Sequence, residues 1–237
     1  MSVEFIVFFA ILSFLTSLLT SIFSLGGGLI MLVALAQSFS PATLIPLHGS
    51  IQLANNFSRT LVYREFFQWK LIKHIVISTM FGAVIGIYLF GTLPENLLVM
   101  VIAATILFLT WAPLDSLILS IMKNDWFCGF ISGFAGIFVG ANGPLVTAYL
   151  RTKNLSPEVL VANHGAIMIF QHGIKIILFA SFFNFIILDY FIFILILALT
   201  GYAGAIPGRR LISKVPFKSF NIILKVLLTL LAFSLFF

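Results

Sequence analysis

Between Glu4 and Arg59 the chain runs for 54 residues without a charged side chain. A helix needs only about 20 predominantly apolar residues to cross a bilayer, so this stretch is long enough for more than one membrane segment. Hydrophobic residues make up 61% of the 237 residues and charged residues 8%, against roughly 25% charged residues in soluble domains. Apolar runs of this length are typical of helices. The sequence therefore predicts an all-α polytopic membrane protein.

The charges and the cysteine content exclude several classes of function. The net charge is +6, but Lys and Arg cluster in short loops, as the positive-inside rule expects, and form no nucleic-acid face. The single cysteine, Cys128, excludes an intramolecular disulfide and a cysteine-based metal cluster. No polar stretch is longer than a loop, which leaves no room for a soluble enzyme domain. The N-terminus lacks signal-peptide features, and we interpret it as the first membrane segment.

The sequence contains an internal repeat. Residues 40–51 and 156–167 both begin with Ser-Pro and both contain His-Gly, at a constant offset of 116 residues. The same offset places Gly26-Gly27-Gly28 opposite Asn142-Gly143-Pro144. Similarity in a fixed register over this length predicts two related halves, residues 1–118 and residues 119–237, within one transmembrane domain.

Each half contains about five expected helical segments. The third segment of each half opens with Ser-Pro, which is an N-cap followed by proline at the first helical position. The segments are expected at about 5–25, 28–38, 41–63, 70–91 and 95–113, and then at about 126–140, 144–150, 157–180, 185–206 and 217–236.

The positions of the basic loops predict that the two repeats are inverted. Basic residues follow the third segment in the first half but the fourth segment in the second half: Arg64, Lys70 and Lys73, then Arg209, Arg210, Lys214 and Lys218. Because basic loops are cytoplasmic, the two halves have opposite orientations in the membrane. This requires each half to cross the membrane an odd number of times. Residues 126–150 are too few for two full spans, so we expect broken or re-entrant helices near mid-bilayer and external termini.

A polar stripe on each third segment marks a candidate site. In the first half it contains His48, Gln52, Asn55 and Arg59 at helical spacing, with Asn56 beside it. The second half repeats it with His164, Gln171, His172 and Lys175, and Met168 takes the position of Gln52. Polar groups at this depth normally face a cavity or a partner. Two alternatives stay open: the amides could be interhelical hydrogen-bond contacts, and Arg59 and Lys175 could snorkel.

The glycine-rich breaks indicate the charge of the substrate. Each break precedes a short helix, whose N-terminal N–H groups and dipole favour an anion. No acidic residue aligns with either stripe, so the cavity suits a small anion and implies no metal or cofactor. The expected substrate-binding residues are Gly26, Gly27, Gly28, His48, Gln52, Asn55, Asn56, Arg59, Asn142, Gly143, Pro144, His164, Gln171, His172 and Lys175.

These motifs resemble the TauE/SafE family of sulfite and sulfonate exporters, also called the toluene-sulfonate uptake permease family. The resemblance is carried by Gly26-Gly27-Gly28 and by residues 46–59, 140–145 and 171–175. Two departures concern the expected site: Leu32-Val33-Ala34 stands where the family commonly has a proline, and Asn142 replaces a threonine. The resemblance implies transport of sulfite, sulfoacetate or related organosulfonates, usually across the bacterial inner membrane.

The sequence therefore favours a secondary transporter for a small anion, because inverted repeats with broken helices are characteristic of such proteins. The alternatives are an anion channel and, with less support, an intramembrane metalloenzyme that uses His48, His164 and His172. The expected partners are the anion and the lipid bilayer. Protons are the candidate coupling ion, with His48 and His164 as carriers, because histidine titrates near neutrality.

Overall fold

The computed structural model describes residues 1–23, 26–112, 124–140, 142–212, 225–226, 228–230 and 233. Within these ranges every regular element is a helix. Four stretches are long and apolar enough to cross a membrane: Val3–Phe23, Trp69–Phe90, Pro157–Phe183 and Ile187–Leu211. Together with the shorter apolar helices, they agree with an all-α protein that passes through the membrane several times.

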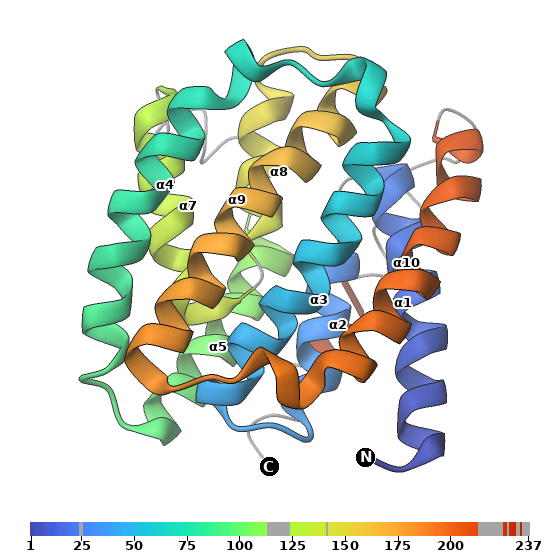
Figure 1. Ribbon diagram of the computed structural model, residues 1–237. Helices are drawn as coiled ribbons and strands as arrows, with labels where there is room; N and C mark the ends of the chain where they lie inside the picture. The colour runs from blue at the N-terminus through green and yellow to red at the C-terminus, as the bar shows by residue number, and fades with distance from the viewer. Residues whose placement is uncertain are drawn as a thin grey trace.

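The helices are named in chain order (Figure 1). They are α1 (Val3–Phe23), α2 (Gly27–Ala36), α3 (Pro41–Val62), α4 (Trp69–Phe90), α5 (Glu95–Trp111), α7 (Asp125–Val139), α8 (Gly143–Arg151), α9 (Pro157–Phe183) and α10 (Phe191–Leu211), with short 3-10 helices η1 (Arg64–Phe66) and η2 (Ile187–Tyr190).

The two Ser-Pro motifs begin helices, as the sequence predicts. α3 starts at Pro41 and α9 at Pro157, each directly after a serine with an extended backbone. The Ser156 hydroxyl accepts a hydrogen bond from the N–H of Val159 at 3.4 Å. Proline lacks an N–H group, which would have no partner in the first helical turn, and it therefore fits these positions.

The two glycine-rich segments interrupt helices. Gly26, between α1 and α2, has φ of 92°, and Gly140, at the end of α7, has φ of 76°. A side chain with a Cβ atom disfavours this left-handed region, whereas glycine enters it readily. Glycine therefore allows the chain to reverse between α1 and α2 and between α7 and α8.

Each interrupted pair folds back on itself as a hairpin. In the first hairpin, the rings of Phe5 and Phe39 lie 6.2 Å apart, so the start of α1 lies near the end of α2. In the second, the Tyr149 hydroxyl donates to a carboxylate oxygen of Asp125 at 2.7 Å, which joins the end of α8 to the start of α7.

The hairpins open toward opposite ends of the molecule. Phe39 packs on Tyr190, which precedes α10, with 6.0 Å between ring centroids. Residues 63–68, which connect α3 to α4, lie instead at the far end of α10, where Glu65 forms an ion pair with Arg209. Asp125 and the start of α4 belong to that second end, because His74 lies 4.0 Å from the Asp125 carboxylate.

Three helix pairs make up the body of the protein. The long helices α3 and α9 pack together at the centre, while α1 packs on α10 and α4 packs on α7 (Figure 1). Glycines allow the outer pairs to approach closely. A Cβ atom at Gly82 of α4 would overlap with the Phe130 carbonyl of α7, and one at Gly204 of α10 would overlap with the Phe14 carbonyl of α1.

Some boundaries differ from those expected. The fourth segment of the second half was expected at about 185–206, but α10 covers 191–211. Asn184 ends α9 in a left-handed conformation, with φ of 53°, and η2 occupies most of the residues that follow. In addition, α1 has 21 residues and α7 only 15, so the first segments of the two halves differ in length. Most of the helix expected at 217–236 lies outside the described residues.

Candidate functional site

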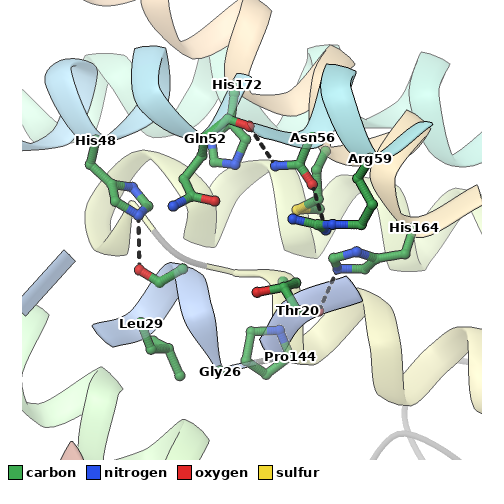
Figure 2. A pocket seen from close by; sticks show the side chains of 13 residues that line it. Thr20, Gly26, Leu29, His48, Gln52, Asn56, Arg59, Pro144, His164 and His172 are labelled. Atoms are coloured by element: carbon green, nitrogen blue, oxygen red, sulfur yellow. Dashed lines mark hydrogen bonds between the residues drawn. The ribbon is translucent and has the colours of Figure 1, made fainter. Parts of the chain in front are cut away.

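A buried cavity lies where the two helix breaks meet the central helices α3 and α9 (Figure 2). Its volume is about 30 Å³, which is more than the ~10–15 Å³ that a cavity needs to hold a water molecule. The lining residues are Thr20, Gly26, Gly28, Leu29, His48, Gln52, Asn56, Arg59, Gly143, Pro144, His164, Met168 and His172. Ten of the fifteen residues expected from the sequence are among them.

A histidine attaches each central helix to a short helix. The Nε2 atom of His48 on α3 lies 2.9 Å from the carbonyl oxygen of Gly28 in α2. Likewise, the Nε2 atom of His164 on α9 lies 3.3 Å from the carbonyl oxygen of Gly143 in α8. A carbonyl can only accept a hydrogen bond, so Nε2 carries the hydrogen in both rings. Neither Nδ1 atom has a partner among the described residues.

Arg59 brings a positive charge to the cavity wall. Its side chain is 1% exposed, and its Nη1 donates to the Oδ1 of Asn56 at 3.0 Å. Asn56 in turn donates to the Gln52 carbonyl at 2.7 Å. The Nε of Arg59 has no partner in the described part of the chain, and no acidic side chain there forms an ion pair with it. The hydrogen-bond partner of Arg59, Asn56, lies one turn earlier on α3, so the guanidinium does not extend toward the C-terminal end of the helix.

The short helices α2 and α8 both begin at the cavity. Gly26 and Gly28 at the start of α2, and Gly143 and Pro144 at the start of α8, belong to the wall. The first N–H groups of a helix have no partner within it, and the helix dipole makes this end positive. The cavity therefore combines two positive helix ends with a buried arginine, an arrangement that favours an anion.

Five expected residues lie outside the wall, and two of them form a hydrogen-bond network behind it. Asn142 donates to the Oε1 of Gln171 at 2.6 Å and to the Ser132 carbonyl at 2.6 Å. Gln171 donates to the hydroxyls of Thr79 at 3.0 Å and Ser132 at 2.8 Å. These contacts join α4, α7 and α9 at the second break, so both amides form interhelical hydrogen bonds.

Lys175 is also behind the wall. Its ammonium group donates to the Gly140 carbonyl at 2.8 Å and lies 3.3 Å from the Nδ1 of His172. The side chain is 1% exposed, so it does not extend to a membrane surface. Lys175 holds the backbone at the break, whereas Arg59, which is 116 residues earlier, lines the cavity.

The other two expected residues make close helix contacts. Gly27 faces Thr16 and Thr20 of α1, where a Cβ atom would overlap with both. Asn55 donates to the Ser13 hydroxyl at 3.2 Å and lies against Gly201 of α10. Gly27 therefore packs the two helices of the first hairpin together, whereas Asn55 connects α3 to this hairpin and to α10.

Three residues of the wall were not expected from the sequence. They are Thr20, Leu29 and Met168. A signal for Thr20 exists, because buried hydroxyl residues recur at helical spacing along α1: Ser13, Thr16, Ser17, Thr20 and Ser21. In an otherwise apolar helix this spacing marks one polar face. Leu29 and Met168 give no such signal, because apolar residues are common throughout the chain.

The histidines of the cavity do not form a metal site. The rings of His48 and His172 are 5.9 Å apart between centroids. Within the described ranges, no group of three His, Cys, Asp or Glu side chains could hold a metal ion. The metalloenzyme alternative requires such a set, and these side chains do not supply it.

The fold and the cavity define a helical membrane protein with a buried cationic site. The family model "Sulfite exporter TauE/SafE" matches residues 9–235 of the chain. The chain therefore belongs to the TauE/SafE sulfite exporter family, which confirms the resemblance of the glycine-rich motifs. Searches among curated proteins and among solved structures gave no match.

Proposed function

We propose that the protein is a secondary transporter of small sulfur-containing anions, such as sulfite or organosulfonates, in the inner or plasma membrane. The observation that carries this proposal is the buried Arg59, which lines the cavity between two helix N-termini with no acidic partner among the described residues. A buried unpaired charge is costly, and a bound anion would compensate it. The family supports transport as the general activity. We propose that the protein carries out no covalent chemistry.

The proposal includes two inverted repeats, residues 1–118 and 119–237. Matched contacts support it. Gly82 faces Phe130 and Gly204 faces Phe14; Phe130 follows Phe14 by 116 residues, and Gly204 follows Gly82 by 122. The histidine contacts with Gly28 and Gly143 form a second matched pair. In each case a helix of one half makes the same kind of contact as the corresponding helix of the other half.

We further propose that the two hairpins are re-entrant, with their breaks near mid-bilayer. Each hairpin has its two ends close together, as the Phe5–Phe39 and Tyr149–Asp125 contacts indicate. Because the hairpins open toward opposite ends of the molecule, the halves would have opposite orientations. Broken helices that meet at a central site are the usual arrangement in secondary transporters.

The volume of the cavity favours alternating access over a channel. The cavity is small, about 30 Å³, and its wall combines residues of both halves of the chain. A channel requires a continuous path, whereas a closed cavity with groups suited to an anion fits an occluded state. An anion channel is the second candidate, because it would use the same charged groups.

Flux measurements on the purified protein in proteoliposomes test the proposal. External unlabelled sulfite or methanesulfonate should drive counterflow of the same labelled anion, because an alternating carrier exchanges substrate across the membrane. A channel would give conductance without counterflow. Absence of sulfur-anion flux with folded protein would contradict the proposed function.

Protons are proposed as the coupling ion. The free Nδ1 atoms of His48 and His164 are positions where a proton could enter beside a bound anion. Outward movement of an anion is already favoured by an inside-negative potential, at ~2.3 kcal/mol per charge per 100 mV. Proton coupling would therefore matter chiefly for uptake.

A further inference from the structure

Each central helix carries a buried cation that contacts a side chain three residues earlier. On α3, the Nη1 of Arg59 donates to the Oδ1 of Asn56 at 3.0 Å. On α9, the Nζ of Lys175 lies 3.3 Å from the Nδ1 of His172. The two pairs are related by the repeat offset of 116 residues, and Asn56 and His172 both line the cavity. The pairs therefore occupy equivalent places but consist of different chemical groups.

The pair on α3 holds its positive charge in one place. Arginine keeps its proton in proteins, and the amide of asparagine is not a titratable group. Arg59 and Asn56 share a hydrogen bond, but the charge stays on the guanidinium. This fixed charge belongs to the cavity wall.

The pair on α9 can hold its charge on either member. The Gly140 carbonyl accepts from the Nζ of Lys175 at 2.8 Å, and both an ammonium and a neutral amine can donate to it. The Nδ1 of His172 can accept a hydrogen from Nζ, or it can carry that hydrogen and donate it to a neutral Nζ. Two positive charges at this separation repel each other, so the pair carries one.

No acidic side chain in the described part of the chain holds the charge on Lys175. The acids that form ion pairs there are Asp125 and Glu65, and their partners are other residues. Lys175 is 1% exposed and His172 is 3% exposed. A buried charge without a counter-charge is costly, so an anion in the cavity would stabilise positive charge at the wall. His172 belongs to that wall, whereas Lys175 lies behind it.

The other titratable or charged groups around the pair lie on the central helices. α3 contributes Arg59 and His48, whose ring centroid is 5.9 Å from that of His172, and α9 contributes His164. While the cavity is empty, the charge of Arg59 disfavours a second positive charge at the wall, and a bound anion offsets this repulsion. The described hydrogen-bond contacts of α4, α7 and α8 with this part of α9 come from uncharged groups: Thr79, Ser132, Gly140, Asn142 and Gly143.

We infer that Lys175 is a positioning residue whose proton moves to His172 when an anion binds. The Nζ–H bond breaks and an Nδ1–H bond forms, so the ammonium becomes an amine and the imidazole becomes an imidazolium. The positive charge thereby moves from behind the wall to the wall itself, which Arg59 also lines. The Gly140 carbonyl keeps its hydrogen bond from Nζ in both states. The inference rests on the proposed function, because it describes how the same site holds its anion.

Nitrogen NMR of the protein with isotope-labelled histidine tests the inference, because the nitrogen shifts distinguish a neutral imidazole from an imidazolium. The chain has four histidines, and the His172 signals are those lost in His172→Asn. If that variant does not fold, substitutions of the other three histidines identify the signals by elimination. At about pH 7.5, where an ordinary imidazole is mostly neutral, His172 should be neutral without ligand and become an imidazolium with saturating sulfite or methanesulfonate. Methanesulfonate takes up no proton itself near neutral pH.

Lys175→Arg separates proton transfer from a purely structural role. Arginine keeps a cation and a donor for the Gly140 carbonyl but does not release its proton, so His172 should stay neutral when the anion is added. The concentration for half-maximal counterflow should rise about tenfold or more, because the wall loses one hydrogen bond from a charged group. Lys70→Arg, at an exposed position outside the wall, is the control and should change neither measurement.

The wild-type spectrum decides the inference even if the arginine variant does not fold. An imidazolium at His172 before the anion is added, or a neutral imidazole with the anion bound, would overturn it. An imidazolium in Lys175→Arg with bound anion would also overturn it, because the proton would then come from another source. In these cases wild-type counterflow would leave the proposed transport function standing. If no sulfur anion gives counterflow or changes the histidine spectrum, both proposals are wrong.

Discussion

The Nε2 atom of His48 donates a hydrogen bond to the carbonyl oxygen of Gly28 over 2.9 Å, and this bond attaches the central helix α3 to the first turn of α2. It holds the glycine-rich turn that lines the cavity. The ring is fully buried, so the carbonyl has no access to bulk water if the ring is lost. His48 therefore has a role in positioning the site, separate from any role in proton transfer.

Replacement of His48 by phenylalanine should lower both stability and transport. The ring size is similar, but the donor to Gly28 is lost, and an unsatisfied buried acceptor costs about 1–3 kcal/mol. The melting temperature in detergent and counterflow in proteoliposomes measure the two effects. His74→Phe is the matched control, because His74 is 40% exposed and lies outside the cavity wall. If His74→Phe lowers the melting temperature and counterflow as much as His48→Phe does, the positioning role of His48 is contradicted.

Arg59 and Lys175 should respond differently to substitution by glutamine. Arg59→Gln removes the cation of the cavity wall and should weaken anion binding about 10- to 100-fold, since hydrogen bonds to charged groups contribute ~1.5–3 kcal/mol. Lys175→Gln removes the donor to the Gly140 carbonyl and should reduce stability in addition to transport. Binding is measured as the concentration for half-maximal counterflow, and stability as thermal unfolding in detergent. Arg59→Lys should recover part of the binding.

One result would contradict the role of Arg59 in anion binding. If Arg59→Gln transports with unchanged half-saturation, the anion is held by the helix termini and amides alone, and the proposed role of the guanidinium is wrong.

Transport should depend on pH through His48 and His164. A proton on the free Nδ1 of either ring adds positive charge beside the anion, so anion binding should strengthen as the pH falls from about 8 to about 5. Transport by His48→Gln and His164→Gln is measured across this range with the membrane potential clamped. Glutamine keeps a hydrogen-bond donor but does not titrate, so the dependence should flatten. If both variants keep the wild-type profile, proton coupling through this pair is wrong.

Much of the local structure follows from short-range sequence signals. Ser-Pro fixes the starts of α3 and α9 because proline and the serine cap both favour a first helical turn. Glycine at positions 26 and 140 permits the breaks because the backbone there has positive φ. The position of a polar residue on one face of α3 or α9 likewise follows from helical periodicity.

Which neighbour each polar side chain meets could not be predicted in this way. The predicted stripe on α9 contains His164, Gln171, His172 and Lys175, but only its two histidines line the cavity. Gln171 faces Thr79 of α4 and Ser132 of α7, and Lys175 reaches the Gly140 carbonyl. A helical face is wide enough to contact two neighbours, and the sequence of one helix does not specify how the others pack on it.

The close contacts at Gly82 and Gly204 should be equally sensitive to a methyl group. Alanine at either position would force the backbones of α4 and α7, or of α1 and α10, apart, and overpacking costs about 1–3 kcal/mol. We expect Gly82→Ala and Gly204→Ala to lower the melting temperature by similar amounts. Gly173→Ala is the control, because its Cβ would lie 3.7 Å from the Leu53 side chain. A large loss for one glycine and none for the other would contradict equivalent packing of the two pairs.

Cysteine labelling in intact cells should show that the two basic segments share the cytoplasmic side. Glu65 and Arg209 form an ion pair, so the segments after α3 and at the end of α10 lie at the same end of the molecule, and basic residues favour the cytoplasm. In a Cys128→Ala background, Gln68→Cys and Arg210→Cys should be protected from an impermeant reagent. Ser38→Cys is exposed at the opposite end and should be labelled. Position 213, on the same basic segment, lies outside the described residues. Labelling of position 68 or 210 from outside would contradict the proposed orientation of the repeats, because their inversion was inferred from these loops.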